Sequence, residues 1–493
     1  METLEEYFYP FRDDIVGLRQ TFHSPYGVQP IIYSDWAASG RLYYPIEDRL
    51  LKAFGPYVGN PHSESSVTGA AMTIAYQEAR GIIKRHVNAG PDDILLTGSS
   101  GMTGLVNKFQ RILGLKAPQG LRQRIGLPES ERPVVFVTHM EHHSNQTSWH
   151  ETIAEVKVIP PDENGIVDLN TLREMLFEHR DRPLKIGSFT ACSNVTGVFT
   201  PYHELARIVH EHEGYVFIDF AAAAPYAAIN MHPPDPAESL DAVMFSPHKF
   251  LGGPGSSGVL LFNRNLYRNT VPDDAGGGTV AWTNPWGDYM FLDDVEVRED
   301  GGTPGFLQAF KAALAIQLKE SMGIDRIHRR EAEIVSRALK GLRAIPRVHV
   351  FAGNIDHRLA MVSFVAEGIH YNLMVRLLND RYGIQSRGGC SCAGTYGHYL
   401  LQVDAPRSRR ITDKIAEGDL SDKPGWVRLS FHPTSTDEEI DQCIFAVGEI
   451  VNNIATWQND YSYCPKTNEY VSLHADSRSD HEERNRVRSW FSL

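Results

Sequence analysis

The chain has 493 residues, which is too long for a single hydrophobic core, so we expect at least two domains. Hydrophobic residues make up 42% of the chain, which is enough to bury a sizeable core. The formal net charge of −13 argues against nucleic acid or an anionic membrane as the main partner, because both are themselves negatively charged.

The N-terminal residues and the cysteines indicate in which cellular compartment the protein works. The first twenty residues, METLEEYFYPFRDDIVGLRQ, are acidic and lack the apolar segment of a secretion signal. We find no apolar run long enough to span a bilayer. The five cysteines are odd in number and unevenly spread, so we expect no disulfide framework. These features predict a cytoplasmic protein in a reducing environment.

Short apolar runs recur between about residues 90 and 265, and each is followed by a small or polar loop. They are DDILLTG, RPVVFVTH, EVKVIP, LKIGSFT, YVFIDF, DAVMFS and SGVLLF. Several are continuously apolar, as expected for strands that are buried on both faces. Helical patterns lie between some of them, for example TGLVNKFQRILGL and PYHELARIVHEHEG. This alternation predicts an α/β protein with a mostly parallel central sheet.

The pattern changes after about residue 305. A long helical stretch, GFLQAFKAALAIQLKESMG, leads into mixed strand-like and helical pieces, which predict a smaller α+β domain. We therefore expect four parts, with a C-terminal tail that is charged and polar. The parts are an N-terminal segment (1–55) that packs with the small domain, a large cofactor-binding α/β domain (56–305), a small C-terminal α+β domain (306–460) and the polar tail (461–493).

Polar residues stand just past the ends of five of the predicted strands. In open α/β sheets, ligands bind at the carboxyl ends of the strands, so these residues predict one shared site. The loop after ILLT opens a helix, and a helix N-terminus is a ready site for phosphate. The polar groups are Gly98–Thr103, His142 in HMEHHSN, Asn194 in ACSNVTG, Asp219 after YVFI, and Ser246, His248 and Lys249 after AVMF.

Lys249 is the most informative of these residues. A lysine that is sheltered beside a phosphate site, an aspartate and a histidine is what a pyridoxal 5′-phosphate (PLP) enzyme requires. The lysine binds the cofactor covalently, and the carboxylate keeps the pyridinium nitrogen protonated. Simpler interpretations remain for single residues, because Lys249 could be an exposed loop lysine and Asn194 an ordinary turn residue. The HMEHH cluster lacks HExxH spacing, so we predict no metal site.

The residues from YSDWAASG to VRLSFHPTSTDEEID resemble the class V aminotransferase family of fold-type I PLP-dependent transferases, and within it the cysteine desulfurases. The motifs MEHHSN, SNVTG, IDFAAA, SPHK, GMTGLVN and GGGTV carry this resemblance. It implies a homodimer and a small amino-acid substrate. The implied roles are His142 stacking on the cofactor ring, Asn194 at its phenolic oxygen, Asp219 at the pyridinium nitrogen, Gly101, Met102, Thr103, Ser246 and His248 at the phosphate, Lys249 as the covalent attachment, Thr279 at the neighbouring subunit's phosphate, and Arg387 and Arg428 at the substrate carboxylate.

The resemblance also implies an activity. Free cysteine would be the substrate, and an enzyme thiolate would take its sulfur as a persulfide, leaving alanine. The loop SRGGCSCAGTYG offers two thiols, and alignment on its arginine and glycine assigns the catalytic one to Cys392. Cys390 would then resolve a persulfide or have no role. A sulfur-acceptor protein is a further expected partner.

Three positions depart from the desulfurase pattern. Ala222 replaces a glutamine, Gly104 an acidic residue and Ser65 a histidine. These changes favour an alternative, namely an aminotransferase or a lyase of the kynureninase or selenocysteine-lyase kind that forms no persulfide. RGGCSC also resembles a loop of molybdenum-cofactor sulfurases, but the chain lacks room for their extra C-terminal domain. A scaffold without catalysis is disfavoured by Lys249 and Asp219 together.

Overall fold

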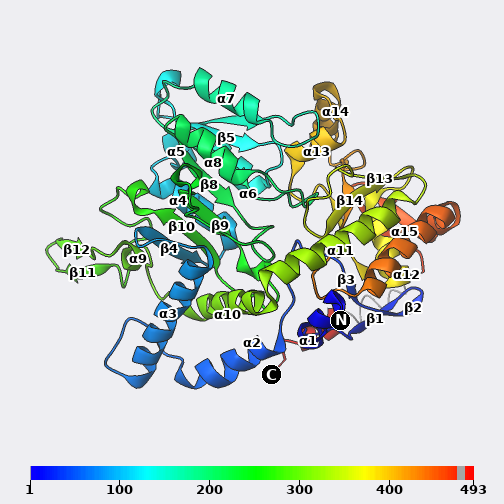
Figure 1. Ribbon diagram of the computed structural model, residues 1–493, viewed down its shortest axis with the longest axis horizontal. Helices are drawn as coiled ribbons and strands as arrows, with labels where there is room; N and C mark the ends of the chain where they lie inside the picture. The colour runs from blue at the N-terminus through cyan, green and yellow to red at the C-terminus, as the bar shows by residue number, and fades with distance from the viewer. Residues whose placement is uncertain (1, 475–483, 493) are drawn as a thin grey trace.

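The structure, a computed structural model, describes residues 2–474 and 484–492 (Figure 1). Two sheets organise the chain, and each is covered by helices. The larger one fills the upper left of Figure 1, and the smaller one lies at the right, between helices from the C-terminal third of the sequence. Residues 475–483 and 493 of the expected polar tail lie outside the described residues.

The larger sheet contains seven strands, and they coincide with the seven apolar runs of the sequence. All pairs are parallel except those made by one strand, β10, which runs antiparallel to both of its neighbours. The mostly parallel α/β fold predicted from the sequence is therefore confirmed. In sheet order the strands are β4 (Asp93–Gly98), β10 (Gly258–Asn263), β9 (Ala242–Phe245), β8 (Tyr215–Asp219), β7 (Lys185–Thr190), β5 (Val134–Thr138) and β6 (Glu155–Ile159).

Consecutive side chains of a strand point to opposite faces, and both faces of this sheet are buried. In β5, Val134 and Phe136 belong to one hydrophobic cluster, and Val135 and Val137 to another. The helices α4 (Gly101–Ile112) and α6 (His143–His150) contribute to the second cluster. The first cluster takes side chains from α3 (Val67–His86), α7 (Leu169–Glu178) and α8 (Tyr202–Glu211). Because helices pack on both faces of the sheet, both sets of side chains in each strand are buried, and the strands are continuously apolar.

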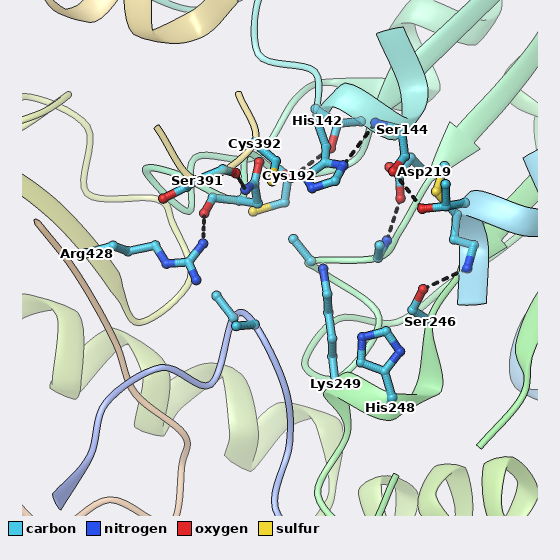
Figure 2. Close-up of a pocket in the computed structure, with 18 of the residues that line it drawn as sticks. His142, Ser144, Cys192, Asp219, Ser246, His248, Lys249, Ser391, Cys392 and Arg428 are labelled. Atoms are coloured by element: carbon cyan, nitrogen blue, oxygen red, sulfur yellow. Dashed lines mark hydrogen bonds between the residues drawn. The ribbon is translucent and has the colours of Figure 1, made fainter. Parts of the chain in front are cut away.

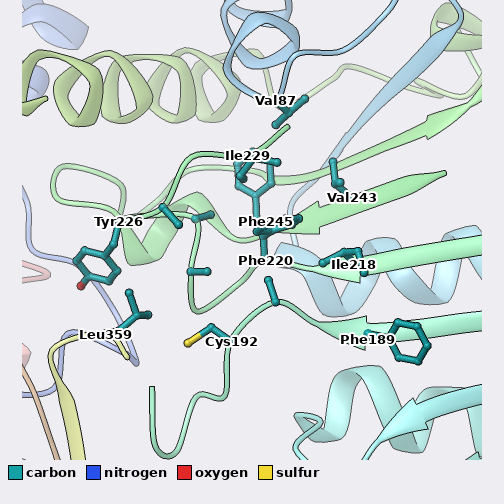
Figure 3. Close-up of a cluster of buried hydrophobic side chains, with 14 of the residues drawn as sticks. Val87, Phe189, Cys192, Ile218, Phe220, Tyr226, Ile229, Val243, Phe245 and Leu359 are labelled. Atoms are coloured by element: carbon teal, nitrogen blue, oxygen red, sulfur yellow. The ribbon is translucent and has the colours of Figure 1, made fainter. Parts of the chain in front are cut away.

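The first cluster extends to the carboxyl ends of the central strands (Figure 3). Phe189 of β7, Ile218 of β8 and Val243 of β9 are completely or almost completely buried there. Phe220 and Tyr226, in the segment after β8, pack into the same cluster. Close packing resists displacement, so these strand ends form a rigid base for the polar residues that follow them.

The smaller sheet is antiparallel, with the order β13 (Val348–Val350), β14 (Met361–Ala366), β17 (Trp426–Ser430) and β16 (Arg387–Gly389). Three helices share a hydrophobic cluster with it, namely α11 (Ile324–Arg343), α12 (Tyr371–Tyr382) and α15 (Asp437–Trp457). The helix α10 (Phe306–Met322) packs against α3 and leads into α11 through Gly323. The mixed α+β character expected after residue 305 is thus present.

The N-terminal segment touches the elements around the smaller sheet. In α1 (Leu4–Asp13), Arg12 forms an ion pair with Glu439 of α15 at 2.6 Å. The short strand β3 (Ile32–Tyr33) pairs in parallel with β15 (Ile384–Gln385). The other N-terminal elements are β1 (Thr21–Ser24), β2 (Gly27–Pro30) and α2 (Tyr44–Arg49).

Besides the antiparallel pair β1–β2, two hairpins of the described residues stand apart from the main sheets. Residues 461–472, assigned from the sequence to the polar tail, form a hairpin of β18 (Tyr461–Cys464) and β19 (Glu469–Ser472). It is tied to α12 because the Tyr461 hydroxyl donates to Asp380 at 3.0 Å. A second hairpin, of β11 (Val280–Thr283) and β12 (Tyr289–Phe291), projects at the left edge of Figure 1. The remaining helices are α5 (Gln119–Arg122), α9 (Val295–Arg298), α13 (Gly394–Leu400) and α14 (Ala405–Ala416).

No membrane span is present in the described part of the chain, because every helix there is too short or too polar to cross a bilayer.

Candidate active site

A cavity of about 300 Å³ lies at the carboxyl ends of β7, β8 and β9, and Arg387 and Arg428 of the smaller sheet also line it (Figure 2). The structure brings most of the predicted site residues to this one place. Gly101 lies beside it, and Thr279 does not line it. The predicted residues that line the cavity are Met102, Thr103, His142, Asn194, Asp219, Ser246, His248, Lys249, Arg387, Cys392 and Arg428.

Lys249 lies at the end of a short 3-10 turn that follows β9 directly. Its side chain extends into the cavity (Figure 2). Burial lowers the pKa of this amine, and the nearby Asp219 carboxylate acts in the opposite direction. A lysine with a lowered pKa is more often neutral, and only the neutral amine is nucleophilic.

Asp219 is the last residue of β8 and is 3% exposed. Its carboxylate accepts a hydrogen bond from the Ala221 N–H at 2.8 Å. Burial raises its pKa, while this hydrogen bond and the Lys249 ammonium lower it. A buried carboxylate is stable in its charged form only beside a cation, so Asp219 is suited to a positively charged group in the cavity.

The N-terminus of α4 meets the Lys249 turn at the other end of the cavity. The Met102 N–H donates to Ser246 Oγ at 2.9 Å, and the hydroxyls of Thr103 and Ser144 lie 2.7 Å apart. Gly101 has φ +60°, and a Cβ there would lie 3.2 Å from Ser246 Oγ. The positive φ and this close approach both favour glycine at position 101. Free N–H groups and hydroxyls in this arrangement can bind an anion such as phosphate.

His142 lines the cavity and is the N-cap residue that precedes α6. Its Nδ1 accepts a hydrogen bond from the Ser144 N–H at 3.1 Å, which fixes the ring at the helix N-terminus. Burial and the neighbouring Lys249 lower its pKa to about 4. The ring is therefore neutral at pH 7, and a neutral aromatic ring can stack on a flat cofactor.

Arg387 of β16 and Arg428 of β17 are paired neighbours in the smaller sheet and both reach the cavity. They share one carboxylate, that of Asp35, with closest N–O distances of 2.9 and 2.8 Å. Arg428 also donates to the backbone carbonyl of Asn194 at 2.8 Å. In the structure the carboxylate that these two guanidinium groups bind is that of Asp35.

The two thiols of the loop after β16 are placed differently. Cys392 is exposed and lines the cavity together with Ser391, whereas Cys390 is partly buried against the hydrophobic cluster. Asn194 contacts this loop, because its Nδ2 donates to the Ser391 carbonyl at 2.7 Å. Its Oδ1 is buried and has no hydrogen-bond partner among the described residues. That atom is free to bind a donor in the cavity.

Thr279 lies at the base of the β11–β12 hairpin, where it is buried and its hydroxyl donates to the Gly276 carbonyl at 2.7 Å. Its expected place beside a partner's phosphate stays a prediction. Among the described residues, no group of three or more His, Cys, Asp or Glu side chains is arranged to hold a metal ion.

The family model for class V aminotransferases matches residues 32–443. The chain belongs to this family. Membership in the class V aminotransferase family confirms the relationship, the fold class and the enzymatic character that the sequence predicted. The matched region contains every residue that we placed at the cavity.

Among its class V relatives, the chain is similar to proteins named as probable cysteine desulfurases. One from Halobacterium salinarum is 28% identical over 431 residues, covering 86% of this chain and 92% of the relative. One from Halalkalibacterium halodurans is 28% identical over 422 residues, covering 84% and 91%. The apo structure of a cysteine desulfurase from Thermococcus onnurineus has a similar fold, with a TM-score of 0.71, 22% identity, and coverage of 90% of this chain and 98% of that one.

The sequence analysis gave no role to Asp35, which binds the two cavity arginines of this class V enzyme, or to Cys192, which lines the cavity. Asp35 stands in the quoted motif YSDWAASG, but its role depends on two arginines more than 350 residues away. Cys192 lines the cavity, and its thiol donates to the Gly197 carbonyl at 3.0 Å. Burial raises the pKa of this thiol, so Cys192 is an unreactive neutral group.

Proposed function

We propose that the chain is a PLP-dependent cysteine desulfurase-like enzyme that converts L-cysteine to L-alanine and a persulfide on Cys392. The observation that carries this proposal is that one cavity is lined by a buried lysine and an exposed thiol, Lys249 and Cys392. A lysine alone would suit any enzyme of this family. The thiol adds the sulfur acceptor that a desulfurase requires.

The residues present fit PLP. The N-terminus of α4 with Ser246 would hold the phosphate, Asp219 the ring nitrogen and Lys249 the reactive carbon. The unpaired, buried Oδ1 of Asn194 offers one more polar contact. When bound, PLP supplies an electron sink that stabilises negative charge at the substrate Cα.

The chain's own residues would perform the remaining tasks. Arg387 and Arg428 would bind the substrate carboxylate and so orient the amino acid. Lys249, as a buried amine beside the reacting carbon, would take the proton from Cα. The Cys392 thiolate would form an S–S bond to the substrate sulfur as the Cβ–S bond breaks. The electron pair of that bond stays on Cβ, which takes up a proton, so that alanine leaves and the persulfide remains.

A second candidate is an aminotransferase or lyase without a persulfide step. The observation that favours it is Ala222, which lines the cavity where desulfurases resembling this chain carry a glutamine. An alanine side chain has no donor for a cofactor oxygen.

The test is turnover of L-cysteine by the purified chain with PLP and dithiothreitol. We expect alanine and sulfide in equal amounts, and no pyruvate. Incubation with pyruvate and glutamate serves as the matched assay for an aminotransferase. Amino-group transfer there, without sulfide from cysteine, would replace the desulfurase proposal by the second candidate.

We also propose a homodimer in which the β11–β12 hairpin contacts the partner. This hairpin carries four strongly exposed apolar side chains, and a patch of this kind marks an interaction surface. They are Trp282, Trp286, Tyr289 and Met290. The glycine run before Thr279 would let the backbone approach the partner's phosphate closely.

We expect the double variant Trp286→Ser, Tyr289→Ser to weaken dimerisation by tenfold or more. The interface would lose two large aromatic side chains that are exposed in the single chain and buried in the dimer. Sedimentation velocity over a range of concentrations measures the change. Phe177→Ser, at an aromatic of α7 that is as exposed as Tyr289, is the control and should leave the dimer intact. A wild-type monomer that turns over at micromolar concentration would contradict the dimer.

A cytoplasmic location and a sulfur-acceptor partner complete the proposal. All five cysteines are free thiols in the structure, which suits a reducing compartment. The exposed position of Cys392 would let an external thiol reach its persulfide.

A further inference from the structure

The turn that presents Cys392 has an unusual backbone. The Ala393 N–H donates to the Cys390 carbonyl at 2.9 Å, closing a four-residue turn. Its two central residues, Ser391 and Cys392, have φ of +49° and +56°. Two successive positive φ angles are typical of a type I′ turn, which favours Asn and Gly. Side chains such as Ser and Cys make this conformation strained, so something else must hold it.

Two hydrogen bonds from outside the turn reach its carbonyl groups, and a third binds Gly394, the residue that follows it. Asn194 binds the Ser391 carbonyl, as described above. The other two come from a single residue of α6. The His143 N–H donates to the Cys392 carbonyl at 2.7 Å, and His143 Nε2 accepts from the Gly394 N–H at 2.9 Å. His143 thus binds the chain on both sides of Ala393.

The imidazole of His143 is suited to this contact. It must be neutral, with its proton on Nδ1, for Nε2 to accept a hydrogen bond. Burial and the positive charge of Lys423 lower its pKa, which favours the neutral ring. The absence of a side chain at position 394 also matters, because a Cβ there would lie 3.1 Å from Nε2.

The two adjacent histidines of MEHHSN therefore have different surroundings. His142 lines the cavity, whereas His143 does not and lies in a groove on the outer side of the thiol loop. The ring of His143 bonds the loop backbone, and it also lies 6.3 Å from the ring of His142. Because His143 does not line the cavity, its hydrogen bond to the loop is its direct connection to the segment that carries Cys392.

We propose that His143 is the positioning residue for the sulfur step, holding the strained turn so that Cys392 faces the cavity. The catalytic part of this inference rests on the proposed desulfurase function. The part that concerns the hydrogen bonds between His143 and the loop does not. Without the imidazole, the turn can relax to a commoner backbone conformation and the thiol leaves its position.

The test compares His143→Ala, His143→Gln and His150→Ala. Gln retains a side-chain acceptor, and His150, exposed at the end of α6, is the matched control histidine. We expect His143→Ala to slow persulfide formation on Cys392 at least tenfold, with KM for cysteine within twofold of wild type. His143→Gln should recover at least half of the wild-type rate, and His150→Ala all of it. Mass spectrometry after a timed quench locates and counts the persulfide.

A structural readout is made on the same PLP-loaded variants without substrate. Hydrogen exchange at the Gly394 amide should be at least tenfold faster in His143→Ala and unchanged in His150→Ala, because only the first loses the acceptor of that N–H. Unchanged exchange at Gly394 would overturn the proposal, and so would a wild-type persulfide rate in His143→Ala. If His143→Ala is poorly folded, His143→Leu takes its place, because leucine fills the space but has no acceptor. Unchanged Gly394 exchange in His143→Leu relative to His150→Ala overturns the proposal equally. Absence of persulfide in the wild type would instead refute the desulfurase function. Exchange at the Gly394 amide would still measure whether His143 fixes the turn.

Discussion

The Lys249→Ala variant is expected to lose turnover of cysteine by a factor of at least about a thousand, because the amine has two tasks in the proposed mechanism. It holds the cofactor covalently, and it takes the proton from the substrate Cα. Lys249 lies at the end of the turn after β9. No other described lysine lines the same cavity, so none can replace it.

Borohydride reduction followed by peptide mass spectrometry measures the attachment directly. Wild-type protein should gain the mass of the reduced cofactor on the peptide that contains Lys249, and the variant should gain none. Lys340→Ala, at an exposed lysine of α11, is the control and should behave as wild type. Cofactor attachment at another lysine, or full activity in Lys249→Ala, would refute the assignment.

The two loop thiols are expected to differ sharply. Cys392→Ser should retain cofactor and cysteine binding but lose sulfide release by about a hundredfold or more, because a hydroxyl is a far weaker acceptor of sulfur than a thiolate. Cys390→Ser should keep most of the activity, since this thiol packs against the hydrophobic cluster and does not line the cavity.

Alanine and sulfide production by the two single variants makes the comparison, and mass spectrometry locates the persulfide. Each variant is the other's control, because both changes replace one sulfur by one oxygen in the same loop. A dead Cys390→Ser with an active Cys392→Ser would reverse the assignment. Full activity in both would leave the aminotransferase or lyase as the better function.

The larger sheet could be predicted from the sequence because each strand is buried on both faces and therefore reads as an unbroken apolar run. The positions of Asp219 and Lys249 followed from the same logic, since each stands where such a run ends. Local patterns were sufficient there, because strand ends in a mostly parallel sheet converge.

Other features depend on contacts between distant segments, which a local pattern does not reveal. Asp35 is one of many acidic residues until the fold brings two arginines to it. The hairpin at residues 461–472 was expected to be part of a polar tail, because its polar composition hides the pairing of Tyr461 with Asp380. The strained turn at Ser391 and Cys392 was also missed, since neither residue type favours positive φ.

The ion pair between Asp35 and Arg428 has a consequence for the order in which the molecule matures. The two residues are 393 positions apart, so Asp35 leaves the ribosome long before its partner is made. The strands that present Asp219 and Lys249 are also complete earlier, and domains generally fold as units during synthesis. The carboxylate-binding side of the cavity is therefore the last part to assemble, and a nascent chain can present its lysine well before it can orient a substrate.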